Sequence, residues 1–289
     1  MGCWILESER MRWQHERGVL KAMKIWASVF FLGLITLYAL GAPLLGMEAS
    51  FIDVAYPTAP PLTAGHWFGT DDLGRDLFVR IAAGARISLT IGLVTAIVAV
   101  VIGTLYGVLA AQLGGLWDVL MMRIIDVIYS LPGLMVVILL SLFLGRGVFA
   151  LVLALALFSW PDTARIIRGQ VLALKQEEFV TAYHSLGGRL AGLLFSHFLP
   201  NLTGLIVLTA TITVPRAILT ESTLSFIGLG VEPPLSSWGT LASEGWQLIR
   251  VAPHLLILPT FFIFTTMVAL NLLGDGLRAW ADPRDRSRT

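Results

Sequence analysis

The chain has 289 residues, of which 56% are hydrophobic and only 13% are charged, and its mean hydropathy is +0.79. A typical soluble domain carries about 25% charged residues, so these values exclude an ordinary water-soluble globular protein. A formal net charge of +1 gives no electrostatic reason to expect a nucleic-acid partner, and the single cysteine, Cys3, excludes an internal disulfide. The composition therefore predicts a protein that crosses a lipid membrane several times.

The apolar residues occur in runs of about 20, the length that a helix needs to cross roughly 30 Å of hydrocarbon. We expect an all-α membrane protein, and prolines and glycines inside the spans indicate a packed bundle. The six predicted transmembrane helices, in chain order, are 25–46, 87–111, 127–144, 149–167, 201–222 and 252–277. Around them lie an N-terminal tail (1–24), a segment outside the membrane (47–86), and a five-helix core (87–277) with a loop at 168–200, followed by a C-terminal tail (278–289).

Lysine and arginine are distributed unequally between the two sides that these spans define. Fourteen of the 20 basic residues fall on the side of the N-terminal tail, and six fall on the other side. Positive charge is enriched on the cytoplasmic side of membrane proteins. We therefore predict a multi-pass protein of the bacterial inner membrane with both termini in the cytoplasm and the 47–86 segment in the periplasm.

Three acidic residues, Asp71, Asp72 and Asp76, precede the second span and at first sight look like a cation-binding loop. However, the spacing of a calcium loop, with its distant bidentate glutamate, is absent. We predict instead an interfacial turn and helix start, with Arg75 and Arg80 as partners for the carboxylates. The five histidines are scattered and no HExxH pattern occurs, so we predict no metal site.

The loop at 168–200 is the longest on the cytoplasmic side, and its apolar residues up to Leu186 follow a helical spacing. Gly187-Gly188 then provides the left-handed backbone geometry that ends a helix, which predicts a tight corner. A second short helix, 189–198, should end before Pro200, because proline cannot continue a helix without losing a hydrogen bond. Because both ends of the loop join membrane helices, a force on this corner would move the fourth and fifth spans. An ordinary amphipathic hairpin at the membrane surface has the same spacing and is the alternative interpretation.

Two charged residues, Arg216 and Glu221, fall inside the fifth predicted span. A charge within a membrane costs several kcal/mol at least and indicates a polar interior or a pathway. Positions five apart on a helix are offset by about 140°, so each residue should find its partner on another helix or in water. Lining of a pathway and a structural pairing between helices both remain open from the sequence.

The 168–200 loop resembles that of the inner-membrane permease subunits of ABC importers, whose pattern is Glu-Ala-Ala, three residues, Gly, nine residues, then Ile, any residue, Leu-Pro. Ala182, Gly187, Leu199 and Pro200 match in register. Thr181, Tyr183 and His197 replace the Glu, the second Ala and the Ile. The resemblance implies an ATPase-coupling loop that comprises Thr181, Ala182, Tyr183, Leu186, Gly187, Leu199 and Pro200.

Five further motifs are similar to those of the C-type permeases of the dipeptide, oligopeptide and nickel uptake group. They lie at 68–80 (FGTDDLGRDLFVR), 84–89, 225–230, 233–239 and 271–283, and Glu221 matches the family's glutamate before the SFxGLG motif. The resemblance covers about residues 66–284. It implies a permease that forms, with a homologous second permease, the pathway for di- or oligopeptides, and a nickel or metal-chelate permease is the alternative.

No GxxxxGK[ST] phosphate-binding loop occurs, so we expect this chain to bind no ATP, to hold no cofactor and to catalyse no reaction. The resemblance implies that ATP and Mg are held by two separate ATP-binding subunits and that a periplasmic substrate-binding protein delivers the solute. The sequence does not identify the solute, because the binding protein would do most of the selecting. An autonomous secondary transporter or channel is the rival from another class, but no internal repeat supports it.

Overall fold

A bundle of long helices makes up most of the computed structural model, which describes residues 23–42, 48–63, 65–145, 147–178, 180, 183, 192 and 197–281. The helices are Met23–Ala42, α2 (Leu77–Leu113), α3 (Gly115–Ser130), α4 (Gly133–Leu144), α5 (Val148–Leu174), α8 (Leu199–Phe226), α9 (Trp238–Gln247) and α10 (His254–Ala281). Within the described residues the only β-type pairing consists of isolated bridges, so the predicted all-α class is confirmed.

Five helices are long and apolar enough to cross a membrane, namely Met23–Ala42, α2, α5, α8 and α10. They match the first, second, fourth, fifth and sixth predicted spans. The second starts earlier than expected, at Leu77, because the Asp76 side chain caps α2 by accepting a hydrogen bond from the Val79 N–H (3.2 Å). The predicted helix start in the acidic segment is therefore confirmed.

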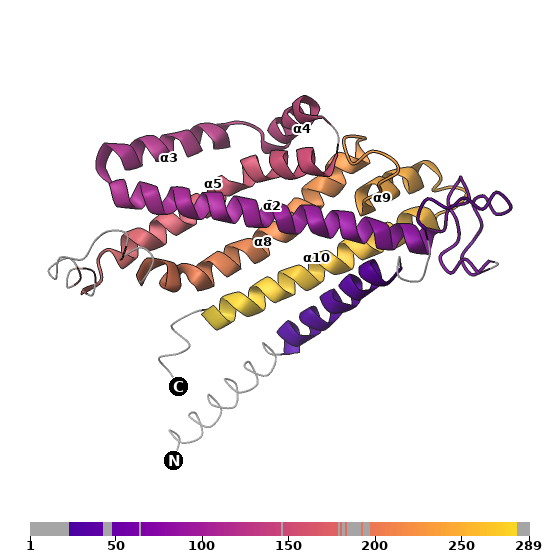
Figure 1. Cartoon of the computed structure of the whole chain (residues 1–289), viewed down its shortest axis with the longest axis horizontal. Helices are drawn as coiled ribbons and strands as arrows, with labels where there is room; N and C mark the ends of the chain where they lie inside the picture. The colour runs from indigo at the N-terminus through magenta and orange to yellow at the C-terminus, as the bar shows by residue number, and fades with distance from the viewer. Residues whose placement is uncertain are drawn as a thin grey trace, which may run out of the picture.

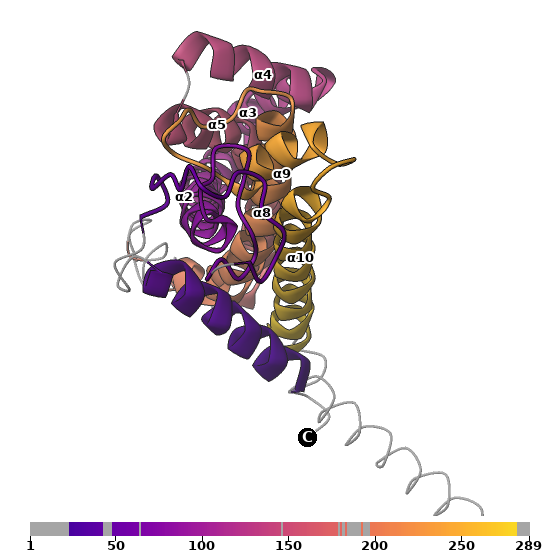
Figure 2. The same ribbon diagram turned by 90° about the vertical axis from the view of Figure 1, so that its right-hand side faces the viewer.

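The predicted third span, 127–144, is wrong as one straight helix. α3 ends at Ser130, α4 begins at Gly133, and the two helices are bent by 88° relative to each other. Leu131 is extended (φ −91°, ψ 140°), the conformation that a proline favours in the residue before it, and the helix ends there. In Figures 1 and 2, α3 runs beside the bundle and α4 turns across it; counted as one broken span, the pair brings the total to six.

α2 is the central helix and runs the length of the bundle, close to α5 (Figure 1). Two glycines make this approach possible. A Cβ added at Gly107 would lie 2.4 Å from the carbonyl oxygen of Ala164, and one added at Gly103 would lie 2.6 Å from that of Trp160. Small residues at such positions let membrane helices pack backbone against backbone.

The described residues 48–63 and 65–76, which precede α2, fold into a lobe at one end of the bundle, beside α9 (Figure 1). Its centre is Asp71, whose carboxylate lies 2.6 Å from Arg75 Nε and 2.6 Å from Arg80 Nη1. Arg80 also pairs with Glu244 of α9 at 2.7 Å, which ties the lobe to the helices. The predicted arginine partners are thus confirmed, and no group of three or more His, Cys, Asp or Glu side chains in the described part of the chain could hold a metal.

The helix ends are sorted between the two ends of the bundle. The Met23 end of the first helix, the Ala281 end of α10, the end of α5 and the start of α8 lie toward the end opposite the lobe (Figure 1). The two helix ends that flank the α5–α8 connection, Leu174 and Leu199, therefore lie at the same end of the bundle as the start of the first described helix and the end of α10.

Candidate functional site

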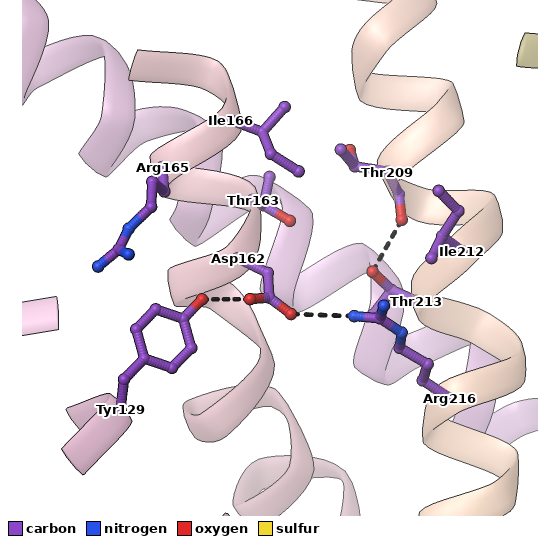
Figure 3. Close-up of a pocket in the computed structure, with 9 residues that line it drawn as sticks. All are labelled: Tyr129, Asp162, Thr163, Arg165, Ile166, Thr209, Ile212, Thr213 and Arg216. Carbon is purple, nitrogen blue, oxygen red and sulfur yellow. Dashed lines mark hydrogen bonds and ion pairs between the residues drawn. The ribbon is translucent and has the colours of Figure 1, made fainter. Parts of the chain in front are cut away.

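A cavity of about 590 Å³ opens between α3, α5 and α8 (Figure 3). Its lining is mixed, with charged, hydroxyl-bearing and aliphatic side chains: Tyr129 from α3, Asp162, Thr163, Arg165 and Ile166 from α5, and Thr209, Ile212, Thr213 and Arg216 from α8. Such a lining can contact both water and the polar groups of a solute.

An ion pair crosses this cavity from α8 to α5. Arg216 Nη1 lies 3.1 Å from Asp162 Oδ2, and the Tyr129 hydroxyl donates a hydrogen bond to the other oxygen of the same carboxylate (Figure 3). Arg165 pairs with Asp126 at 2.8 Å, and its guanidinium lies 4.8 Å from the centre of the Tyr129 ring. The cavity therefore holds a connected set of charges, and Arg216 pairs with another helix, as expected, and not with Glu221.

The depth and exposure of the pair indicate what it faces. Asp162 and Arg216 lie near the middle of α5 and α8, and their side chains are 51% and 69% exposed. Exposed charges at this depth are costly against lipid, so such residues face a bundle interior or a water-filled cavity. This face of the chain is consequently suited to border an aqueous pathway.

Each member of the pair directly follows a proline within its helix, Pro161 in α5 and Pro215 in α8. A proline has no N–H to donate to the carbonyl oxygen four residues earlier in the helix. The carbonyls that lose this hydrogen bond are those of Leu157 in α5 and Thr211 in α8. Membrane helices tolerate this where neighbouring groups or water satisfy the free carbonyl. Each helix therefore has one main-chain carbonyl without its usual helical donor, about one turn before the charged residue.

Glu221, the other intramembrane charge, lies elsewhere and is fully buried. Its carboxylate accepts hydrogen bonds from Ser225 of α8 (2.6 Å) and Ser88 of α2 (3.2 Å), and Ser225 is linked in turn to Ser237 at the start of α9 (3.3 Å). Among the described residues its partners are hydroxyls and not cations. Of the two readings left open by the sequence, this geometry favours a structural one, in which Glu221 joins α2, α8 and α9.

The different surroundings of the two residues predict opposite effects of mutation. Glu221→Ala should lower the stability of the purified complex by about 1–3 kcal/mol, because several buried hydroxyls lose their acceptor. Arg216→Met should leave the melting temperature and yield near wild type but reduce solute uptake, because its side chain is exposed in the cavity. Thermal melts and uptake measured on both variants check this, and the reverse pattern would contradict the assignment.

The predicted coupling loop is described only in part. Thr181, Ala182, Leu186 and Gly187 lie outside the described residues. Tyr183 is described, and its ring centroid lies 5.2 Å from that of His197, which brings the two ends of the loop together. Leu199 and Pro200 form the first turn of α8, where proline costs no hydrogen bond, and Phe198 is the N-cap residue of this helix. The short helix predicted at 189–198 lies mostly outside the described residues, so its end before Pro200 stays a prediction.

Both ends of this loop pack into the bundle. Val180 and Phe198 are buried against Val108 and Ala111 of α2, together with Ile167, Val171 and Leu202 of the adjoining helices. Nearby, Arg168 of α5 makes a two-pronged ion pair with Asp118 of α3, with both N–O distances at 2.5 Å. A displacement of the residues that flank the loop would therefore act directly on α2, α5 and α8, and on α3 through the Arg168–Asp118 pair.

The helices, the broken span and the charged cavity define a multi-pass membrane protein of the transporter class. The profile of the family described as binding-protein-dependent transport system inner membrane component matches residues 99–287. The chain belongs to this family, whose members are membrane components of ABC transporters and not enzymes.

Several characterised relatives are similar over most of the chain. The oligopeptide transport system permease protein OppC of Bacillus subtilis is 46% identical over 88% of this chain and 83% of its own length, and that of Escherichia coli K12 is 45% identical over 97% and 91%. The dipeptide transport system permease protein DppC of B. subtilis is 45% identical over 78% and 71%. Among solved structures, the inward-facing MetNI methionine ABC transporter aligns with a TM-score of 0.53 and 18% identity over 68% of this chain and 96% of that chain, which supports the fold.

Sequence reasoning missed three residues that the structure places in important contacts. Asp162, the partner of Arg216, lies inside the predicted fourth span, where an acidic residue is as unusual as the two charges that were recognised. Searching every span for charges would have found it. The pairings of Asp118 with Arg168 and of Glu244 with Arg80 depend on how distant helices meet, and no local pattern indicates them.

Proposed function

We propose that this chain is the permease subunit of an ATP-driven importer for di- or oligopeptides and lines one side of the translocation pathway. The relatives that carry oligopeptide and dipeptide transport names support the solute class, since they match at 45–46% identity. The observation that carries the pathway assignment is the exposed Asp162–Arg216 pair at mid-span in a large cavity. A homologous second permease facing this cavity would close the pathway.

Energy reaches the pathway through the α5–α8 connection in this proposal. Two ATP-binding subunits, which hold ATP and Mg, dock on the Thr181–Pro200 loop in the cytoplasm, and a periplasmic substrate-binding protein docks at the lobe end. The end of α5 and the start of α8 lie at the same end of the bundle as the Met23 end of the first helix and the Ala281 end of α10, which supports this orientation (Figure 1). The excess of basic residues on that side supports it as well. Closure of the ATPases would then shift the helices between inward-open and outward-open arrangements.

The direct test is uptake by the complete complex. The chain is co-expressed with its second permease and ATP-binding subunits, purified, placed in liposomes and supplied with the binding protein and ATP. We expect ATP-dependent accumulation of labelled tri- to pentapeptides and none with a Walker-lysine mutant of the ATPase. Accumulation of nickel or a metal chelate, with no uptake of any peptide, would contradict the proposed solute.

Coupling should depend on the corner residue of the loop. Gly187→Val is expected to reduce both peptide uptake and solute-stimulated ATP hydrolysis at least about tenfold, because a β-branched residue is poorly accommodated in the left-handed conformation that the sequence predicts there. Gly169→Val is the matched control, because Gly169 lies on the exposed surface of α5 with no atom near its added Cβ. Wild-type uptake and hydrolysis by the Gly187 variant would exclude the coupling role.

A further inference from the structure

Most of the N–H donors of Arg216 have no protein acceptor among the described residues. A guanidinium carries five N–H donors in a planar fork, and among the described residues Arg216 directs one of its nitrogens, Nη1, to a protein acceptor, Asp162. The remaining donors lie on a side chain that is 69% exposed and borders the cavity (Figure 3). Such an edge can receive a carboxylate through two parallel hydrogen bonds.

Asp162 gives Arg216 one anchoring contact. Its Oδ2 accepts from Arg216 Nη1 at 3.1 Å, and its other oxygen accepts from the Tyr129 hydroxyl, so this carboxylate is itself held between α3 and α8. The cavity lining itself carries two arginines, Arg165 and Arg216, against one carboxylate. Arg165 is already paired with Asp126 at 2.8 Å, so the preference for an anionic group of the solute rests on the N–H donors of Arg216 that have no protein acceptor among the described residues.

Arg216 also borders a second, smaller cavity of about 170 Å³. Most of its lining is apolar and includes Leu134 and Val137 of α4 and Leu155 and Phe158 of α5. Among the residues that line the two cavities, Arg216 is common to both. A carboxylate bound to it would therefore lie between a polar space and a small apolar one.

We propose that Arg216 binds a carboxylate of the transported peptide, with the main chain in the larger cavity and an adjacent apolar side chain in the smaller one. This inference rests on the proposed function. A C-terminal carboxylate occurs in every unmodified peptide, so its recognition imposes no requirement on the sequence. An acidic side chain offers the same chemistry, and the test separates the two sources.

The test measures equilibrium binding to the permease–ATPase complex in lipid nanodiscs without the binding protein, which would otherwise impose its own selectivity. The probes are labelled tri-leucine, its C-terminal amide, and the C-terminal amide of Leu-Glu-Leu. For the wild type, we expect amidation of tri-leucine to weaken binding about tenfold or more, the effect of losing about 1.4 kcal/mol. Recovery of binding by amidated Leu-Glu-Leu would support a site that accepts either carboxylate, and its absence would support one for the C-terminus.

Variants assign the effect to Arg216. Arg216→Gln should bind tri-leucine and its amide equally weakly, and Arg216→Lys should show intermediate discrimination, because it keeps the charge and loses the fork. Arg250→Gln, which removes an exposed arginine outside both cavities, is the matched control and should behave as wild type. Melting temperature and gel-filtration profile verify that each variant is folded.

Three results would overturn the inference: no saturable binding to the wild-type complex, equal binding of the free and amidated peptide, or full discrimination by Arg216→Gln. Peptide uptake by the complete system is measured in parallel. Normal ATP-dependent uptake together with any of these results rejects the carboxylate site and leaves the proposed transport function intact.

Discussion

Replacing Asp71 by alanine is expected to lower the stability of the purified complex by about 3 kcal/mol or more. Asp71 is buried, and it accepts hydrogen bonds from the main chain of Leu73 and Arg75 as well as from the side chains of Arg75 and Arg80. Arg80 is only 4% exposed, so without Asp71 a buried cation keeps Glu244 as its remaining partner. Removing one member of a buried pair is costly because the other charge has already been taken out of water.

Asp72→Ala provides a matched control for this prediction. Asp72 is the next residue along the chain and is exposed. The Asp72→Ala variant loses the same functional group from the same lobe, but from an exposed position. Its melting temperature should therefore stay within about one degree of wild type, as for most surface substitutions. Thermal unfolding in one detergent at one ionic strength compares the three proteins, and equal melting temperatures would show that the Asp71–Arg80–Glu244 contacts contribute little.

The second large effect is expected at the α2–α5 contact. Gly107→Leu should prevent assembly of a stable complex, because the first side-chain carbon would lie 2.4 Å from the carbonyl oxygen of Ala164 and 3.0 Å from the main-chain nitrogen of Arg168. Overpacking a core costs about 1–3 kcal/mol where side chains can adjust. Here the obstacle is the backbone of a neighbouring helix, so the helices must separate and also lose their close packing along this contact.

Gly169→Leu tests whether that effect is specific to packing. Gly169 lies on the exposed side of α5, and nothing lies within 4 Å of the position of its added Cβ. We expect normal copurification of the partner subunits with this variant and a loss of at least about tenfold in complex yield with Gly107→Leu. Equal yields would mean that α2 and α5 are not held together as the structure indicates.

The spans could be predicted from the sequence because the cost of exposing apolar side chains to water acts on each segment separately. Runs of the right length therefore indicated five of the membrane helices, although α2 begins well before its predicted start and α5 extends past its predicted end. The third failed because the hydrophobic signal continues through Leu131 and Pro132, whereas the backbone breaks there. The proline was visible, but prolines also lie within the continuous helices α5, α8 and α10, so its presence alone does not distinguish a break from a tolerated bend.

The candidate site was predictable only in part, because the contacts between its charged residues depend on how separate helices pack. Arg216 was visible as a charge inside an apolar run, and its offset from Glu221 correctly indicated a partner on another helix. Which helix supplies that partner depends on the rotation of α5 about its axis, which places Asp162 toward α8. The burial of Glu221 likewise depends on the packing of α2, α8 and α9 against one another, and no local pattern in a single sequence indicates which helices pack together.

The length of α2 gives it a mechanical role. With 37 residues at 1.5 Å each, it is a rod of about 56 Å. Near its C-terminal end, Val108 and Ala111 pack against the residues that flank the α5–α8 connection. At its N-terminal end, beside the lobe, Arg80 forms ion pairs with Asp71 and Glu244. A tilt of about 5° about the middle of such a rod moves its two tips by about 2.5 Å in opposite directions. Under the proposed orientation, a movement that the ATPases impose on the cytoplasmic end of α2 would be transmitted by this rigid helix to the surface where the binding protein docks.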